Sequence, residues 1–191
     1  MSVGKRAELE LYGHTITGGW ARVNCPDGAC RVTGPGVLTG GGSGIGINSS
    51  GSIFATDVTA QDNAVGLYGV RMRLQNVTAT ANTSHGINAF GGVTGSDVTV
   101  TDNGDTGLSL DFRGNVVITR LVATGNGWGG VICDFGRVKL TDSTVTGNEF
   151  PDEFEPPLLD LFSAKRPKLT NTTCDHSLGP NDSTWGVCTG D

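Results

Sequence analysis

The sequence predicts an all-β fold: a right-handed parallel β-helix, a single-stranded solenoid of about eight turns with roughly 21 residues each. Two observations predict it. First, residues 93–103 form a pattern that recurs along the chain, and a Gly-apolar pair such as Gly107-Leu108 follows each copy. Second, apolar and polar residues alternate with period two inside each copy, which is typical of short strands and not of helices. The copies span residues 53–63, 72–82, 93–103, 116–126 and 138–148.

An asparagine ends each copy. Successive asparagines lie 19, 21, 23 and 22 residues apart, so they become vertical neighbours when the turns stack about 4.8 Å apart. Asparagine tolerates the left-handed backbone of a tight turn, and its amide can bond the backbone or the next asparagine. We therefore predict a structural ladder rather than a catalytic row. Its members are Asn63, Asn82, Asn103, Asn126 and Asn148.

The whole chain, 1–191, is expected to form one domain with four parts. Residues 1–31 supply an N-terminal turn and a stapled loop, residues 32–148 the regular turns, and residues 169–191 a C-terminal cap. Between them, the acidic, proline-rich residues 149–168 are interpreted as an inserted side loop that folds an apolar plug onto the rod. An alternative role for this loop is calcium binding by Asp152, Glu153 and Glu155.

The two ends of the chain follow the repeat less closely. In the first turn the pattern places His14 in an inward slot, where a hydrogen-bonded structural histidine is expected. In the second turn it places Val37 and Thr39 inward. A degenerate last turn has Leu169 and Cys174 inward, and a further Gly-apolar restart at residues 185–187.

Composition limits the class of partner. The chain has 31 glycines, 17% charged residues and a net charge of −6, with no Gly-X-Y register. This balance disfavours nucleic acid, which requires clustered Lys and Arg, and no apolar run is long enough to span a membrane. We expect a monomer that contacts neither nucleic acid nor membrane.

Cysteine spacing indicates an oxidising compartment. Cys25 and Cys30 flank a Pro-Asp-Gly turn, and Cys174 and Cys188 bracket the last segment, which predicts two local disulfides with Cys133 left over. The alternative is five reduced thiols in a cytosolic protein. Two disulfides favour a secreted protein, extracellular or periplasmic. The first residues lack an apolar signal core, so any export signal has been removed or lies outside this sequence.

Residues 9–18, Leu-Glu-Leu-Tyr-Gly-His-Thr-Ile-Thr-Gly, resemble the opening turn of pectate-lyase-like right-handed β-helix proteins, and residues 76–87 are similar to the repeats of that superfamily. The resemblance covers nearly the whole chain and implies the fold. The superfamily includes polysaccharide lyases, polygalacturonase-type hydrolases, mannuronan epimerases, periplasmic accessory proteins and non-catalytic binding modules. The chain has no epimerase Tyr-Gly-Phe-Asp-Pro stretch and no polygalacturonase Gly-His-Gly or Arg-Ile-Lys motif, so no catalytic residue is carried over.

One outward surface mixes aromatic rings, amide, hydroxyl and carboxylate. Asp111 and Asp134 occupy equal positions in successive turns, and two stacked carboxylates either share a proton, bind a cation such as calcium, or meet Arg113 or Arg137. A shared proton supplies the acid and base of glycosidic cleavage, and His85 is a candidate proton carrier. The predicted substrate-binding residues are Tyr68, Asn88, Phe90, Ser109, Arg113 and Arg137.

A second outward surface carries Thr-x-Thr pairs, which resemble the flat ice-binding face of some β-helical antifreeze proteins. The pairs are Thr15/Thr17, Thr78/Thr80, Thr99/Thr101 and Thr144/Thr146, with Thr59/Gln61 as an interrupted one. Threonine is also simply a good exposed strand residue.

These observations lead to an extracytoplasmic carbohydrate-active β-helix that acts on or binds a polysaccharide, of lyase, hydrolase or epimerase type. If it is an enzyme, Asp111 and Asp134 are its acid and base or its calcium ligands. The alternative is a non-catalytic polysaccharide-binding or structural module, and a third hypothesis is ice binding through the threonine rows.

Overall fold

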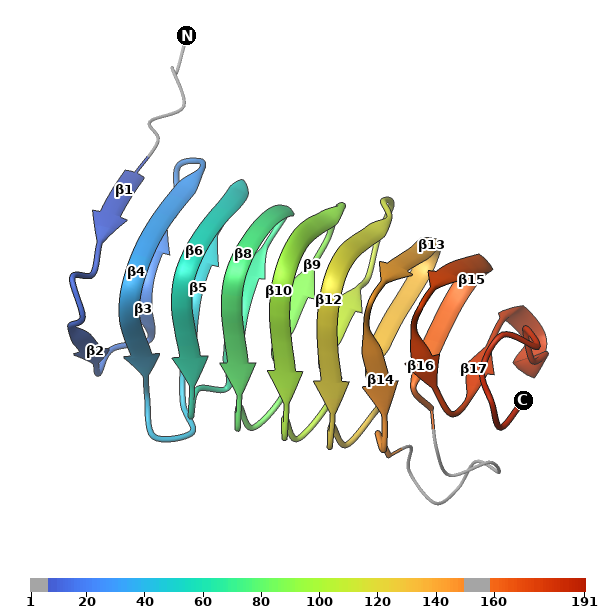
Figure 1. Ribbon diagram of the computed structural model, residues 1–191. Helices are drawn as coiled ribbons and strands as arrows, with labels where there is room; N and C mark the ends of the chain where they lie inside the picture. The colour runs from blue at the N-terminus through green and yellow to red at the C-terminus, as the bar shows by residue number, and fades with distance from the viewer. Residues whose placement is uncertain (1–6, 150–158) are drawn as a thin grey trace, which may run out of the picture.

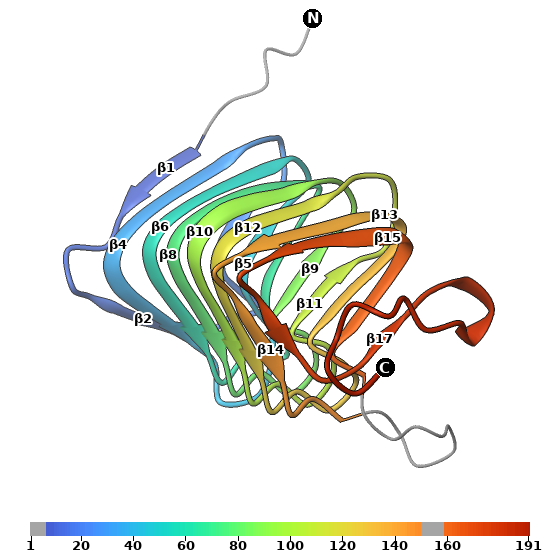
Figure 2. The ribbon, with the colours of Figure 1, turned by 45° about the vertical axis from the view of Figure 1, so that its right-hand side comes forward.

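The computed structural model describes residues 7–149 and 159–191, and this part of the chain is a parallel β-solenoid with a repeat of about 22 residues. Successive windings stack side by side along a rod (Figure 1) and overlay one another when the rod is turned (Figure 2). The turns number about six within the described residues, fewer than the eight predicted, and the windings at the two ends contain only short strands. The predicted fold class is confirmed.

Each winding crosses three faces. The short-strand face contains β3 (Ala21–Cys25), β5 (Ile45–Ser49), β7 (Val65–Gly69), β9 (Ile87–Ala89), β11 (Leu108–Leu110), β17 (Ser177–Leu178) and the first residues of β13 (Val131–Thr141) and β15 (Leu161–Thr170). The middle face contains β1 (Ala7–Glu10), the first halves of β4 (Cys30–Thr39), β6 (Ser52–Gln61), β8 (Arg71–Thr80), β10 (Val93–Thr101) and β12 (Val116–Thr124), and the ends of β13 and β15. The threonine face contains β2 (Thr15–Thr17), the second halves of β4, β6, β8, β10 and β12, then β14 (Thr144–Thr146) and β16 (Thr173–Cys174).

The middle and threonine faces share single bent strands from β4 to β12. One residue with positive φ marks the bend in each of four consecutive strands, so the backbone turns a corner without losing its ladder on either side. These residues are Asp57, Asn76, Asp97 and Arg120, with φ between 50° and 58°. Aspartate and asparagine adopt this conformation more readily than most side chains, which explains their recurrence.

Inward side chains fill a continuous apolar core, as the period-two alternation predicted. The inward residues of the short-strand face are fully buried, among them Leu67, Ile87, Leu108 and Val131. Glycines precede these residues because the neighbouring winding is too close for a side chain. A Cβ on Gly66 would lie 2.4 Å from the carbonyl oxygen of Gly86.

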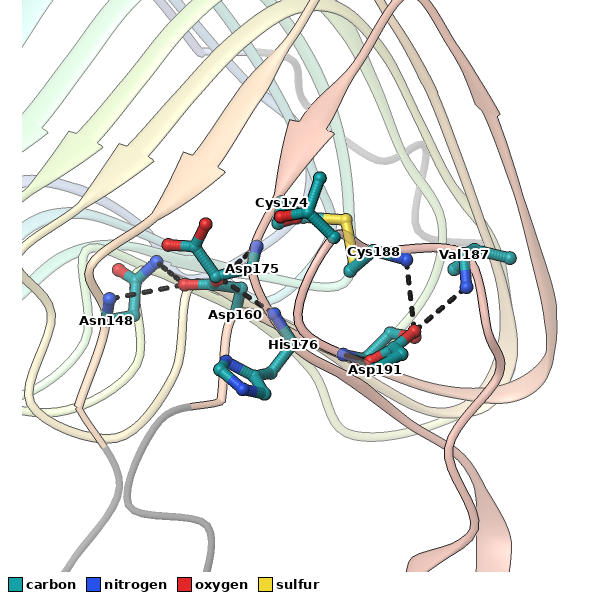
Figure 3. The surroundings of a disulfide bond; sticks show 10 residues. Asn148, Asp160, Cys174, Asp175, His176, Val187, Cys188 and Asp191 are labelled. Carbon is teal, nitrogen blue, oxygen red and sulfur yellow. Dashed lines mark hydrogen bonds between the residues drawn. A yellow bond between two sulfur atoms is a disulfide. The ribbon is translucent and has the colours of Figure 1, made fainter.

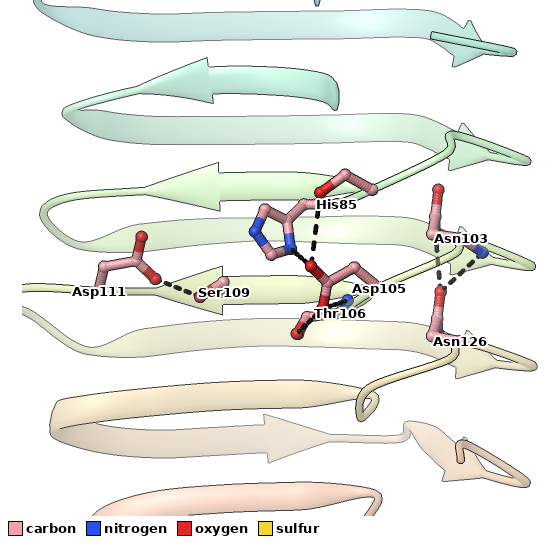
Figure 4. Close-up of polar contacts among 8 residues, drawn as sticks. His85, Asn103, Asp105, Thr106, Ser109, Asp111 and Asn126 are labelled. Carbon is pink, nitrogen blue, oxygen red and sulfur yellow. Dashed lines mark hydrogen bonds and ion pairs between the residues drawn. The ribbon is translucent and has the colours of Figure 1, made fainter. Parts of the chain in front are cut away.

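The asparagine ladder is confirmed. From Asn82 to Asn126 each side chain donates its Nδ2 to the Oδ1 of the next asparagine, at 2.9 Å from Asn82 to Asn103 and 2.7 Å from Asn126 to Asn148. The bond from Asn103 to Asn126 measures 2.8 Å (Figure 4). Asn63 joins the ladder through its backbone N–H, while its Nδ2 donates to the carbonyls of Leu38 and Gln61. Each Nδ2 also reaches a backbone carbonyl in the preceding winding, and each backbone N–H donates to the next Oδ1. The amides therefore satisfy turn groups that burial would otherwise leave unpaired.

A charged residue lies near each end of the ladder, but only Asp160 bonds to one of its asparagines, and the Oδ1 of Asn63 at the other end is buried without a partner in the described residues. Arg22, only 8% exposed, donates from its guanidinium to the carbonyls of Gly18, Gly19, Thr39 and Ser43 at the N-terminal end. At the other end Asp160, fully buried, accepts the Nδ2 of Asn148 at 2.9 Å (Figure 3). The Arg22 guanidinium thus donates to backbone carbonyls in the first windings, and the Asp160 carboxylate accepts from N–H groups at the last asparagine.

The second winding departs from the predicted register. Thr33 pairs with Thr56 and Gly36 with Val58, so two residues, 34 and 35, stand opposite one residue of the next strand. This extra residue moves the following side chains by one position. Leu38 is buried, while Val37 and Thr39, which were predicted to point inward, align with the outward Thr59 and Gln61. His14 is exposed, so its predicted inward position is also wrong.

The C-terminal segment differs from the predicted loop and plug. Leu161–Thr170 forms strand β15, so residues 161–168 continue the solenoid. The proposed calcium residues Asp152, Glu153 and Glu155 lie outside the described residues. Ser177–Leu178, and not residues 185–187, forms the last short strand.

Both predicted disulfides are present, Cys25–Cys30 and Cys174–Cys188, and Cys133 is a buried free thiol. The second disulfide holds the terminal residues against the last winding, where the Asp191 carboxylate accepts the backbone N–H groups of Val187 and Cys188 (Figure 3). Two disulfides are compatible with an oxidising, extracellular environment. None of the described helices is long and apolar enough to cross a membrane.

Candidate functional site

The predicted outward row of the short-strand face forms as expected. Tyr68 pairs with Asn88, Asn88 with Ser109, and Ser109 with Ile132, in parallel register across β7, β9, β11 and β13. The row is recessed in its centre, because Asn88 is 7% and Ser109 5% exposed. The Oδ1 of Asn88 is buried with no hydrogen-bond donor.

Phe90 follows β9 and borders this row. Its ring meets that of Tyr68 edge to face, with centroids 5.3 Å apart. Phe90 remains 37% exposed, so the pair presents an aromatic surface beside the recessed amide and hydroxyl. These predicted binding residues are therefore brought together.

Asp111 and Asp134 follow directly after the paired residues Leu110 and Cys133, at the corner between the short-strand and middle faces. Partial burial, and secondarily the Asp111 carboxylate, raises the pKa of Asp134 above its ordinary value, although part of its side chain is exposed. The hydroxyl of Ser109 donates to Asp111 (Figure 4). The Asp134 carboxyl is thus better suited to donate a proton than an ordinary aspartic acid at the surface.

No arginine neutralises this pair within the described residues. The ion pairs of Arg120 with Asp97 and of Arg31 with Glu8 involve other carboxylates. Arg113 is exposed nearby, and Arg137 lies on the middle face. Of the three alternatives for the stacked carboxylates, the ion pair with Arg113 or Arg137 does not form in the part of the chain that the structure describes.

Two exposed phenylalanines stand next to the carboxylates. Phe112 and Phe135 are each 61% exposed, and their rings lie 6.1 Å apart. We call the surface formed by Asp111, Phe112, Asp134 and Phe135 the Asp-Phe corner. The sequence carried the signal for the phenylalanines, because Asp-Phe follows a buried residue in two successive turns. Exposed aromatic side chains in contact with each other are typical of a binding surface.

His85 does not belong to this corner. It precedes β9 and its Nδ1 lies 3.6 Å from the Oδ2 of Asp105, which precedes β11. Asp111 follows β11, so the strand separates the histidine pair from the carboxylates (Figure 4). The structure gives His85 no contact with the residues it was predicted to serve.

A basic cluster was missed in the sequence. Arg137 and Lys139 of β13 pair with Lys165 and Lys168 of β15, and the four side chains line a hollow of about 400 Å³ on the middle face. Residues 149–168 were predicted to form a side loop, so Lys165 and Lys168 were not expected on the sheet beside Arg137 and Lys139. Further along the same face, Arg31 and Arg73 lie over the ring of Phe54 at 5.3 and 5.8 Å.

The threonine face is more continuous than predicted. Strand register aligns two outward rows across successive windings, and the hydroxyl oxygens of Thr80 and Thr101 lie 3.0 Å apart. The first row is Thr15, Val37, Thr59, Thr78, Thr99, Val122, Thr144 and Thr173. The second row is Thr17, Thr39, Gln61, Thr80, Thr101, Thr124 and Thr146.

Three or more His, Cys, Asp or Glu side chains do not come together as a metal-binding group anywhere in residues 7–149 and 159–191. Asp111 and Asp134 thus offer two carboxylates, fewer than the six to eight oxygen ligands of calcium. The remaining ligands would have to come from backbone, water or substrate.

The fold defines this chain as a parallel β-solenoid with an acidic, aromatic corner beside a basic cluster. No family model, curated protein or solved structure matches it. Function must therefore be argued from the surfaces themselves, since one fold supports many activities.

Proposed function

We propose that this protein is an extracytoplasmic, carbohydrate-active β-solenoid of the pectate-lyase-like type that binds a polysaccharide across the Asp-Phe corner. The observation that carries the proposal is the stacking of two Asp-Phe pairs in adjacent windings. It places two exposed rings, 6.1 Å apart, beside two carboxylates. Aromatic rings pack against the apolar faces of sugars, and carboxylates accept hydrogen bonds from sugar hydroxyls.

The neighbouring surface supports an extended ligand. Tyr68 and Phe90 continue the aromatic surface along the short-strand face, two and one windings before Asp111. Windings stack about 4.8 Å apart, so the rings and carboxylates from β7 to β13 extend over roughly 15 Å. The recessed Asn88 and Ser109 lie between them as polar groups.

The same corner suits chemistry on the bound chain. The Asp134 carboxyl, with its raised pKa, is suited to donate a proton, and the Ser109-bonded Asp111 to accept one. Glycoside hydrolysis uses two carboxyl groups in these roles. A non-catalytic binding module would use the same rings and carboxylates without product release.

The test is a panel of acidic and neutral polysaccharides, with both binding and product formation measured. Phe112→Ala combined with Phe135→Ala should weaken binding at least tenfold, whereas Thr99→Ala on the threonine face should leave it unchanged. Asp111→Asn should abolish turnover and spare binding if the protein is an enzyme. Binding that survives the loss of both rings contradicts the assignment.

A second candidate is ice binding, favoured by the two threonine rows that align across the windings. A flat array of hydroxyl and methyl groups at regular spacing offers a surface that orders water. This function predicts thermal hysteresis that Thr78→Tyr abolishes and Asp111→Asn leaves unchanged. Absence of hysteresis in the wild-type protein excludes it.

A further inference from the structure

Cations are concentrated on one side of this acidic protein. Eight of the thirteen Lys and Arg residues lie in β4, β8, β13 and β15, and these four strands contain a single carboxylate, Asp134. The middle face also contains Glu8 and Glu10 on β1, and Glu8 pairs with Arg31, so the excess of cations lies on β8, β13 and β15. The densest part of this excess is the basic cluster of Arg137, Lys139, Lys165 and Lys168.

Strand pairing holds these four side chains together. Arg137 pairs with Lys165 and Lys139 with Lys168, with an irregularity between the two pairs. One residue separates the cations on β13 and two separate them on β15, so the ladder is locally bulged. The backbone N–H of Arg137 donates to the Oδ1 of Asn115 at 3.0 Å, which ties β13 to the preceding corner.

No carboxylate of the described residues neutralises the cluster. Within the described residues none of the four cations forms an ion pair, and the Nε of Arg137 is buried with no acceptor. Like charges about 5 Å apart repel by roughly 1 kcal/mol per pair even in water. A buried donor without an acceptor adds a cost of about 1–3 kcal/mol. An anion in the hollow would relieve both.

We infer that this hollow binds a sulfate or phosphate ester group on the polysaccharide that lies across the Asp-Phe corner; the inference rests on the proposed function. A sulfate ester carries one negative charge, as a carboxylate does, but it offers three terminal oxygens to an arginine fork and to lysine point charges, and a phosphate monoester adds a second negative charge. A hollow of about 400 Å³ is far larger than a free ion and lies within the range of ligand sites. It therefore fits an oxyanion attached to a sugar ring.

The geometry connects the cluster to the corner. Phe135 and Arg137 are two residues apart on β13, and Phe112 and Asn115 are three apart at the preceding corner. A chain that contacts the two rings thus continues directly onto the cations. Asp111 and Asp134 are acidic, so they repel a ligand that places its own carboxylates at the Asp-Phe corner.

The experiment measures binding of the full-length protein to dextran sulfate, unmodified dextran, polygalacturonate and a single-stranded oligonucleotide at two salt concentrations. Dextran sulfate should bind most tightly and weaken as salt rises. Lys139→Gln combined with Lys168→Gln should weaken it at least tenfold. Arg71→Gln, an exposed cation of β8 on the same side of the rod, should change it less than twofold. Inorganic sulfate and phosphate as competitors distinguish the two esters.

The outcomes separate the two proposals. Dextran bound as tightly as dextran sulfate would overturn the oxyanion site and leave carbohydrate binding intact. Inorganic sulfate or phosphate bound through Lys139 and Lys168, with no glycan bound, would support the anion site and refute the carbohydrate function. Tighter binding of polygalacturonate or of the oligonucleotide, or equal losses in the Arg71→Gln control, would overturn the inference.

Discussion

The carboxylate of Asp160 occupies the place of a further asparagine above Asn148. Its Oδ1 accepts both the backbone N–H and the Nδ2 of Asn148, at 3.2 and 2.9 Å, and its Oδ2 accepts the N–H groups of Asp175 and His176, at 2.7 and 3.2 Å. Because this one carboxylate accepts four hydrogen bonds, two from Asn148 and two from the following winding, both of its oxygens have donors and the ladder ends there. The solenoid is thereby joined to its C-terminal winding.

Replacement of Asp160 is accordingly expected to be strongly destabilising. Asp160→Ala removes the acceptor of the buried backbone N–H of Asn148 and of the partly buried N–H groups of Asp175 and His176, whereas the Nδ2 of Asn148 keeps two backbone carbonyls. A buried donor left without an acceptor costs about 1–3 kcal/mol, so a loss of at least about 2 kcal/mol is expected. Urea denaturation with both disulfides intact measures it. Asp27→Ala, at an exposed carboxylate, is the control and should change stability by less than about 0.5 kcal/mol. If Asp160→Ala lowers the free energy of unfolding no more than Asp27→Ala does, the Asp160 carboxylate does not stabilise the end of the ladder.

Close contact between windings predicts a sharp difference between two glycines. In Gly66→Ala the new methyl would lie 2.4 Å from the carbonyl of Gly86 and 3.1 Å from the Nδ2 of Asn82, which should cost about 2 kcal/mol or more. Gly92 is the matched control, since a Cβ there meets nothing closer than 3.5 Å. Thermal unfolding of both variants provides the comparison. Equal tolerance would contradict the spacing of the windings.

The two disulfides should differ in their contribution to stability. The loop closed by Cys174 and Cys188 has a sequence separation of 14 and that of Cys25 and Cys30 a separation of 5. Loop-closure entropy then gives about 3 kcal/mol for the former and about 2 kcal/mol for the latter. Paired Cys→Ser variants test the order by denaturant unfolding. A larger loss at Cys25 and Cys30 would reverse it.

The pH dependence of stability should differ in sign at two aspartates. The pKa of Asp134 is raised by burial and by Asp111, so its favourable contribution is present at low pH and is lost as pH rises through the folded pKa. Asp134→Asn should therefore stabilise the protein slightly at pH 7, by less than about 1 kcal/mol, and have no such effect near pH 3.

For Asp191, burial opposes ionisation, but bonds from Ser177, Cys188 and Val187 outweigh it and lower the pKa. Its contribution is present above the ordinary pKa and disappears as pH falls through the lowered one. Asp191→Asn should therefore destabilise at pH 7 and lose this effect in acid. Parallel unfolding curves at pH 3, 5 and 7 measure both aspartates, and the same sign at both would refute the assignment.

The repeat made most of the fold predictable, because evenly spaced residues such as Asn82 and Asn103 report the stacking directly. The repeat gave wrong positions where an irregular backbone changed the number of residues in a turn. Residues 34 and 35 oppose one residue of the next strand, which displaced Val37 and Thr39 outward. Asp160 follows Asn148 by 12 residues instead of about 22, so no periodic argument reaches it.

The candidate site, like the fold, could be predicted only where it follows the repeat. Equal sequence contexts placed Asp111 and Asp134 side by side, and their aromatic neighbours were visible in the same motif. The basic cluster was not, because its partner strand begins after an irregular segment and is defined only by pairing of β13 with β15. His85 was grouped with the carboxylates although β11 separates them, since proximity in sequence does not show which end of a strand a side chain occupies.

The most direct test of carbohydrate binding at the Asp-Phe corner is an amide chemical-shift map recorded while fragments of dextran sulfate or polygalacturonate are added to the protein. The proposed site predicts that the largest changes fall at residues 111–115 and 134–137, with smaller ones near Tyr68 and Phe90. Changes confined to the threonine face, or none at saturating glycan, would contradict it.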